Sequence, residues 1–385
     1  MGAGRKRRKV RSNTGEYFDY NILIIVALLV IFGLIMIYST SSYNALNEYN
    51  DAYHYLKRQG VAIIGGIIAM IITIFFPLKF FLKFSELIYA ISLVAVILVL
   101  SPIGRSEGGA TRWIYIGPIS IQSAELVKIS IILLLATFIC KYNSSLLNKW
   151  KILFAFMVPS LIAAGMIFFI TNNLSSAIIV VGIAFVMLFV ASPNYSKFFA
   201  VVGAGLAVVL LAVMIIVRMA NSADGNFRVV RVLAWLDPEA YSNDTGYQIL
   251  QSLYAIGSGG IFGKGLGESM QKLGFIPESQ NDMIFSIICE ELGLCGAFML
   301  IFLFGLLLWR MMLVAINTRN KAGCLVVVGV IAHIAIQVVL NIAVVTNSIP
   351  NTGISLPFIS YGGSSVLCLL VEIGLVLNVS RNIKV

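Results

Sequence analysis

The chain has 385 residues, of which 59% are hydrophobic and 11% charged, and its mean hydropathy is +0.95. Soluble globular domains carry about 25% charged residues, so this composition excludes a soluble protein and indicates that a bilayer surrounds most of the chain. The net charge of +10 does not indicate nucleic-acid binding, because it is concentrated in places that fit a membrane topology.

The N-terminus carries a basic cluster, Arg5 to Lys9, ahead of the first apolar segment. We interpret residues 1–20 as a cytoplasmic tail and residues 21–385 as one polytopic transmembrane domain. The first apolar segment has about 20 residues, longer than the roughly 7–15 apolar residues of a signal peptide. We therefore expect it to span the membrane.

Apolar segments of spanning length recur along the chain with short polar breaks. They predict an all-α membrane protein with about ten transmembrane helices, at about 21–40, 60–76, 85–102, 122–140, 152–170, 174–191, 198–217, 283–309, 323–345 and 363–380. Most lysines and arginines fall on one side if the N-terminus is inside. The positive-inside rule then places both termini in the cytoplasm.

Three outer segments follow from this orientation, at about 103–121, 218–282 and 346–362. The second is a large extracellular loop between helices 7 and 8, longer than a helical bundle needs, which indicates a function. Within it, residues 246–273 contain an amphipathic part and a glycine-rich turn, a pattern that fits a re-entrant or interfacial helix and equally fits a flexible linker. We expect the chemistry to be external.

Charged residues at membrane depth are costly and are functional candidates. Glu125 and Lys128 lie three residues apart on one helical face, where they can form a structural ion pair or line a polar cavity. Glu372, deep in the last helix, has the same two interpretations. The five cysteines and the two histidines show no metal-ligand spacing, so no metal site is predicted from the residues, and His333 is interpreted as a packing residue.

Asp282 stands at the start of the eighth predicted helix. A carboxylate there is stabilised by the helix dipole, so capping is one interpretation. The other is a general base at the mouth of a cavity, where partial burial raises the pKa of a carboxyl group towards neutrality.

Several motifs together resemble the SEDS family of cell-wall membrane proteins, which includes FtsW, RodA and SpoVE. They are GATRWI from Gly109, GPISIQSAELVK ending at Lys128, the segment 237–296, and TGISLPFISYGGSS from Thr352 to Ser365. The likeness covers about residues 20–380, and residues 265–272 favour the FtsW/SpoVE branch. Some positions differ from the family pattern, namely Ser123, Ala124, Asn172, Asn173, Asn281 and Met283.

The resemblance implies a glycosyltransferase that polymerises lipid II on the outer face of the bacterial cytoplasmic membrane, for septal or spore cell wall. It implies a class B penicillin-binding protein as partner, and a divalent cation, Mg²⁺ or Mn²⁺. It places the catalytic aspartate at Asp282. The substrate-binding candidates are Arg112, Trp113, Glu125, Lys128, Arg228, Arg231, Lys264, Ser360, Gly362 and Gly363.

Two other functions fit the same residues. A lipid II flippase would use the same polar cavity and the same cations, although we detect no inverted repeat of the kind that supports alternating access. A non-catalytic scaffold for a transpeptidase would tolerate replacement of Asp282. Transport driven by ATP is disfavoured because no phosphate-binding glycine loop is present.

Overall fold

The computed structural model describes residues 18–107, 110–116, 119–142, 149–218, 227–242 and 245–383. The basic cluster of the predicted cytoplasmic tail lies outside these residues. The helices are α1 (Tyr20–Tyr49), α2 (His54–Phe75), α3 (Leu78–Lys83), α4 (Ser85–Leu98), α5 (Ser123–Lys141), α6 (Trp150–Thr171), α7 (Leu174–Ala191), α8 (Ser196–Arg218), α9 (Phe227–Leu236), α10 (Thr245–Gly259), α11 (Ile284–Asn317), α12 (Lys321–Val345) and α13 (Gly363–Arg381).

The helices confirm a multi-pass membrane protein. In the described parts of the chain, nine of them are long and apolar enough to cross a bilayer, and α4 is a shorter apolar helix. Its 14 residues extend about 21 Å, less than the roughly 30 Å of a hydrocarbon core. The predicted segment 85–102 is therefore the one that the structure shortens most.

Residues 171–173, which separate the predicted segments 152–170 and 174–191, form a tight turn between α6 and α7. Asn172 adopts a left-handed conformation at φ 50°, and the Asn173 side chain accepts a hydrogen bond from the Ser176 amide at 2.9 Å. Asparagine is suited to both positions, because it tolerates the left-handed region and caps helix N-termini.

The last helix, α13, packs closely against α2. A Cβ atom on Gly374 would lie 2.8 Å from the Met70 carbonyl oxygen, so only glycine permits this approach. At the end of α2, the Asn378 side chain donates to the carbonyl oxygens of Thr73, Ile74 and Phe76 at 3.0, 2.9 and 2.6 Å. These bonds satisfy carbonyl groups that a helix end leaves unpaired.

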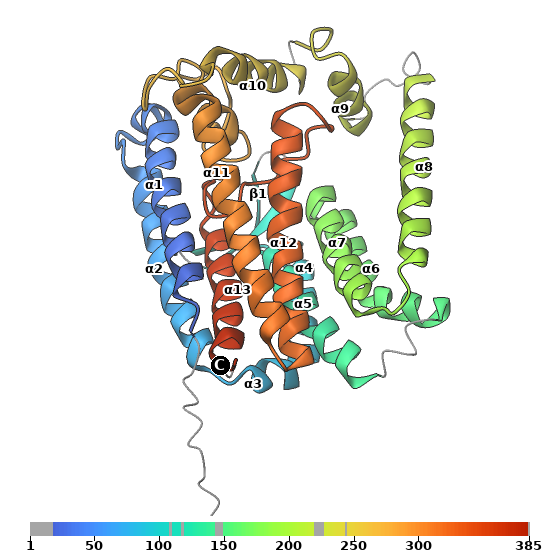
Figure 1. The fold of residues 1–385 in the computed structure, drawn as a ribbon. Helices are drawn as coiled ribbons and strands as arrows, with labels where there is room; N and C mark the ends of the chain where they lie inside the picture. Colours follow the sequence, from blue (N-terminus) through green and yellow to red (C-terminus); the bar gives the residue numbers. More distant parts are fainter. Residues whose placement is uncertain are drawn as a thin grey trace, which may run out of the picture.

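The start of α1 and the end of α13 lie at the same end of the bundle (Figure 1). Asp19 caps α1 and forms an ion pair of 2.8 Å with Arg310 of α11, while its backbone amide is 3.5 Å from Ser380 Oγ. The cytoplasmic assignment of this end stays a prediction from the charge distribution.

The opposite end of the bundle carries a small antiparallel sheet that the sequence analysis did not predict. Its strands are β1 (Gly104–Glu107), β2 (Ala110–Ile116) and β3 (Ile119–Gln122), in the order β1-β2-β3. β-Branched and aromatic residues favour strands. The described residues of the expected outer segment 103–121 therefore form strands, and β3 leads directly into α5.

The described parts of the long outer segment, residues 227–242 and 245–282, are also folded. Figure 1 shows α10 lying across the end of the bundle above α11. The glycine-rich turn after α10 pairs with α11 through backbone hydrogen bonds, from Lys264 and Gly265 to the carbonyls of Glu290 and Glu291, at 2.9 and 3.0 Å. Gly293 (φ 67°) breaks the helical geometry at this point. The helix beside a glycine-rich turn is confirmed, and the flexible-linker interpretation is wrong for this part.

Candidate functional site

Asp282 lies where two outer segments meet, immediately before α11. The Asn341 side chain of α12 donates to the backbone carbonyl of Asp282 at 2.8 Å. Asp282 Oδ2 also lies beside the last outer segment, because a Cβ placed on Gly353 would be 3.7 Å away. The segment that ends the long loop and residues 346–362 therefore form one structure around this carboxylate.

The environment of Asp282 raises the pKa of its carboxyl group to about 6, mainly because burial disfavours the charged form. The negative charge of Glu278 also raises this pKa, while backbone hydrogen bonds and the charge of Arg231 lower it. A carboxyl group with a pKa near neutrality can accept a proton and still be ionised at physiological pH.

Arg231 and Arg112 supply positive charge to the same region. Arg231 of α9 donates from Nη1 to the Asn351 carbonyl at 3.4 Å, and the pKa of its guanidinium is lowered by burial and by Arg112, and raised by Asp282. Arg112 of β2 donates to the carbonyls of Thr171 and Asn172, at 3.4 and 3.3 Å. Two outer segments thus supply the two arginines. Arg231 interacts electrostatically with both Arg112 and Asp282.

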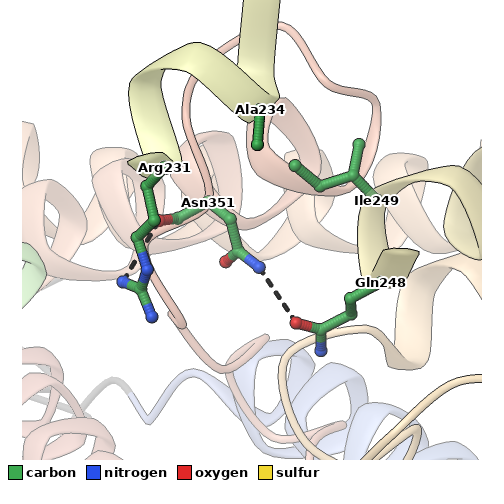
Figure 2. A pocket seen from close by; sticks show the side chains of 5 residues that line it. All are labelled: Arg231, Ala234, Gln248, Ile249 and Asn351. Atoms are coloured by element: carbon green, nitrogen blue, oxygen red, sulfur yellow. Dashed lines mark hydrogen bonds between the residues drawn. The ribbon is translucent and has the colours of Figure 1, made fainter. Parts of the chain in front are cut away.

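A small cavity of about 40 Å³ lies beside Arg231. Figure 2 shows its five lining residues and the hydrogen bonds from Arg231 to Asn351 and from Asn351 to Gln248. Drug-sized ligands occupy pockets of about 300–1,000 Å³. This cavity admits water, whereas a sugar would require the outer segments to separate.

Trp113 does not share a face with Arg112. The two residues are neighbours on β2, where successive side chains point to opposite sides of the sheet. Trp113 pairs with Arg105 on β1 and with Gln122 on β3, and it is half-buried. Its sugar-binding role stays a prediction.

Glu125 and Lys128 form a buried ion pair of 2.7 Å inside the bundle. Lys128 Nζ also donates to Gln337 Oε1 at 3.2 Å, and only 1% of its side chain is exposed. The structural ion pair that the spacing allowed is therefore present. Binding of substrate by this pair stays a prediction.

Lys264 forms an ion pair with Glu290 and not with the region around Asp282 where the two arginines lie. Its Nζ lies 2.6 Å from Glu290 Oε1, and Glu290 also accepts from Ser269 Oγ. Next to it, Lys272 pairs with Glu291 at 2.7 Å, and Ser39 of α1 donates to the same carboxylate. These two ion pairs bind the segment 264–272, which precedes Asp282 in the chain, to the first part of α11.

The predicted residues of the last motif have local partners. Ser360 Oγ accepts from the Leu356 amide at 2.7 Å, and the Gly362 amide donates to Gln59 Oε1 at 3.1 Å. A Cβ atom on Gly363 would lie 3.2 Å from Ala62 Cβ. These contacts hold the segment against α2. The Arg228 side chain lies outside the described residues.

Several polar residues of the site were missed at the sequence level. They are Ser39, Lys272, Glu290, Glu291, Gln337 and Asn341. The two adjacent glutamates fall within the predicted 283–309 helix, so the cost of charge at membrane depth could have identified them. Gln337 and Asn341 are spaced as neighbours on one helical face.

The cation implied by the resemblance has no matching set of protein ligands here. Among residues 18–107, 110–116, 119–142, 149–218, 227–242 and 245–383, no group of three or more His, Cys, Asp or Glu side chains could hold a metal ion. The charges that act on Asp282 include that of Arg231, which is a cation itself. The arrangement does not fit a protein-held metal, and the cation stays a prediction.

Comparison with known proteins decides the family. The family FTSW_RODA_SPOVE, described as cell cycle protein, matches residues 19–385. The chain belongs to this family. It is 37% identical to stage V sporulation protein E of Bacillus subtilis (strain 168), over 94% of this chain and 97% of that protein. It is 36% identical to the probable peptidoglycan glycosyltransferase FtsW of the same strain, over 95% of this chain and 91% of that protein.

Solved structures of the SEDS family share the fold. A chain described under "Structural coordination of polymerization and crosslinking by a peptidoglycan synthase complex" has a TM-score of 0.75 and 27% identity, with 95% of this chain and 98% of that chain covered. RodA of Thermus thermophilus has a TM-score of 0.67 and 25% identity, with 95% and 97% covered. The SEDS resemblance, and with it a helical membrane fold, is confirmed.

Proposed function

We propose that this SEDS protein is a peptidoglycan glycosyltransferase that polymerises lipid II into glycan strands. Two relatives are named probable peptidoglycan glycosyltransferase FtsW. The observation that carries the proposal is the environment of Asp282. A half-buried carboxyl group with a pKa of about 6 lies in the field of a partly buried arginine, at the junction of two outer segments.

In this reaction Asp282 is the general base. Its carboxylate takes the proton from the 4-hydroxyl of the acceptor GlcNAc, and the freed oxygen attacks C1 of the donor MurNAc with inversion. The C1–O bond to undecaprenyl pyrophosphate breaks as the new C1–O bond forms. Such a base contributes about 10²–10⁴-fold to the rate.

Arg231 and Arg112 stabilise the leaving pyrophosphate. Guanidinium groups bind phosphate oxygens in pairs, and partial burial strengthens their effect on developing negative charge. Both arginines now donate to backbone carbonyls, at 3.3–3.4 Å. These bonds are long, so a pyrophosphate oxygen can replace the carbonyl acceptors.

The proposal includes location and partner. The site faces the outside of the bacterial cytoplasmic membrane, which the charge distribution favours. A class B penicillin-binding protein crosslinks the product, which agrees with the solved relative from a peptidoglycan synthase complex. The proposed role is in septal or spore wall. The family description, cell cycle protein, and the relative named stage V sporulation protein E support it.

The test is glycan polymerisation by the purified protein in detergent, supplied with lipid II, with and without a class B penicillin-binding protein. Wild type is compared with Asp282→Asn and with Asp237→Asn, which removes an exposed carboxylate from the same outer loop. We expect polymer from wild type and Asp237→Asn only. Equal polymer from Asp282→Asn would remove this residue as the base.

The same assay separates the alternatives. Absence of polymer in every sample, together with lipid II transfer across vesicle bilayers, would indicate the flippase. Stimulation of a transpeptidase that is unaffected by Asp282→Asn would indicate the scaffold.

A further inference from the structure

A polar stripe runs along one face of α12, deep inside the bundle. Its members are His333, Gln337 and Asn341, which recur every four residues and therefore share one side of the helix. Each is at most 1% exposed. Unpaired polar groups are costly at this depth, so the partners of the stripe indicate what it does.

The inner part of the stripe reaches a carboxylate in the last helix. His333 Nδ1 lies 2.8 and 3.0 Å from the two carboxylate oxygens of Glu372, and neither side chain is exposed. On the other side of the ring, His333 Nε2 lies 2.8 Å from Gln337 Oε1. The same Gln337 oxygen accepts from Lys128 Nζ, which connects the Glu125–Lys128 ion pair.

The outer part of the stripe reaches the catalytic region. Gln337 Nε2 donates to the Ser355 carbonyl at 3.0 Å. One turn further, Asn341 Nδ2 donates to the carbonyls of Ile354 and Asp282, at 2.6 and 2.8 Å. A continuous chain of hydrogen bonds therefore joins Glu372 to the segment beside Asp282. We call the five residues Glu372, His333, Gln337, Lys128 and Asn341 the polar ladder.

The directions of these bonds follow from the groups themselves. The Gln337 amide nitrogen must face the Ser355 carbonyl, which only accepts, so Gln337 Oε1 faces Lys128 and His333. This oxygen only accepts as well, so His333 Nε2 must carry a hydrogen. One proton then lies between His333 Nδ1 and Glu372, as an imidazolium with a carboxylate or as an imidazole with a carboxylic acid. In both forms the pair is neutral and His333 Nε2 carries a hydrogen.

We propose that His333 and Glu372 are positioning residues for the Asp282 site. Glu372 orients the His333 ring so that Nε2–H donates to Gln337 Oε1. This bond fixes the orientation of the Gln337 amide, whose nitrogen donates to Ser355 in the last outer segment. If the ring turned a bare Nε2 towards Gln337, two lone pairs would face each other and the amide would rotate. Lys128 and Ser355 would then lose their partner. The inference rests on the proposed glycosyltransferase activity for its effect on rate, and on the structure alone for the tautomer.

The tautomer can be measured directly, because the chain contains only two histidines. His54→Gln leaves His333 as the only histidine, and His54 is half-buried at the first position of α2. In protein labelled with ¹⁵N in the histidine ring and reconstituted in lipid, solid-state NMR distinguishes a ring nitrogen that carries hydrogen from one that does not. We expect Nε2–H in the His54→Gln parent and in its Glu372→Gln variant. A parent ring with hydrogen on Nδ1 and a bare Nε2 would overturn the proposal.

The activity test uses two substitutions of one residue. Glu372→Gln can still donate to Nδ1 of a neutral ring, so it retains the ladder and the parent rate. Glu372→Leu removes the partner, and we expect kcat to fall about tenfold to a hundredfold with KM nearly unchanged, as for a small misplacement of catalytic groups. Ile373→Val, which removes one buried methyl group next to Glu372, is the control for packing.

A second variant keeps the test decisive if Glu372→Leu does not fold. Gln337→Glu retains an acceptor for Lys128 and His333 and, as a carboxylate beside the Lys128 ammonium, cannot donate to Ser355. We expect the Nε2–H tautomer to persist while kcat falls. Parent rates in both Glu372→Leu and Gln337→Glu would overturn the positioning role. Absence of polymer from wild type would contradict the proposed function, while the NMR result would still test the ladder.

Discussion

The side chain of Asn341 donates to the backbone carbonyl of Asp282 at 2.8 Å and to that of Ile354 at 2.6 Å. One fully buried amide thus joins the end of the long outer loop to the last outer segment. Because Asp282 directly precedes α11, the direction of its carboxylate depends on a backbone that α12 holds in place. The proposed catalytic base is therefore positioned by a residue of a membrane helix.

Replacement of Asn341 by alanine should therefore lower both stability and rate. Two carbonyl groups lose their donor, and each unsatisfied buried group costs about 1–3 kcal/mol. We expect a lower unfolding temperature in detergent and a kcat that falls about tenfold or more while KM changes little. Ile334→Val, which trims the same helix without removing a hydrogen bond, should retain kcat. An unchanged kcat in Asn341→Ala would contradict the positioning.

The rate of polymerisation should depend on pH through Asp282. Only the carboxylate can accept a proton, so kcat/KM should decrease as pH falls below about 6, the raised pKa of this group, and level off above it. Glu278→Gln removes a charge that raises this pKa and should move the acid limb to lower pH. Arg231→Gln removes a charge that lowers it and should move the limb to higher pH. Initial rates across the pH range, with protein integrity checked at each pH, test both directions.

The same burial predicts that the ionised carboxyl group destabilises the fold. The pKa of Asp282 is about 6 in the folded chain, against 3.8 for an aspartate exposed to water. The protonated carboxyl group therefore contributes fully to the free energy of unfolding below about pH 3.8, and this contribution is lost as pH rises through about 6. Asp282→Asn removes this loss, and should stabilise the protein at pH 7 by about 1–3 kcal/mol. Thermal unfolding in detergent at pH 5 and pH 7 measures it, and a lower unfolding temperature for the variant at pH 7 would contradict the burial.

The membrane helices could be predicted from the sequence because spanning length and apolar composition are local properties. The outer segments could not, because their folding depends on contacts between distant residues. The sheet at 104–122 and the pairing of Lys264 with Glu290 both require partners that the sequence does not place side by side. Spacing predicted the Glu125–Lys128 pair because its members share one helical face.

The partners of the remaining site residues could not be predicted for the same reason. His333 was interpreted as a packing residue and Glu372 as a charge without a nameable partner, yet they lie on different helices and bind each other. Asp282 was a candidate for two roles. The capping interpretation is wrong, because Met283 is the N-cap of α11 and no side chain caps this helix. The catalytic role depends on burial and on nearby charge, and it stays a prediction. Those two quantities exist only in the folded chain.

Breaking the ion pair between Lys272 and Glu291 should lower the free energy of unfolding much more than breaking an ion pair at the surface. Both side chains are largely buried, at 8% and 0% exposed. Removal of one partner from a buried pair leaves an uncompensated charge and costs about 3–5 kcal/mol. Lys272→Met and Glu291→Leu should each lower the unfolding temperature strongly, and the double variant should lose less than the two single losses combined.

The exposed pair of Lys57 and Asp51 is the matched control, with 67% and 34% of the side chains exposed. Such a pair contributes about 0–1 kcal/mol, so Lys57→Met should change the unfolding temperature little. Equal effects of Lys57→Met and Lys272→Met would show that the segment before Asp282 is not fastened by its buried ion pair.

Gly293 allows the glycine-rich turn to pair with α11, and its replacement should abolish this contact. A Cβ atom there would lie 2.4 Å from both the Gly263 amide nitrogen and the Ile261 carbonyl oxygen. The backbone is also in the left-handed region, with φ 67°, which disfavours residues with a side chain. Gly293→Ala should therefore separate the turn from α11, reduce the yield of folded protein and eliminate polymerisation. Gly305→Ala, on the same helix with nothing within 4 Å of the added atom, should behave as wild type. Size-exclusion profiles in detergent and polymerisation rates for the two variants measure the difference, and parent behaviour of Gly293→Ala would show that the close backbone pairing is dispensable.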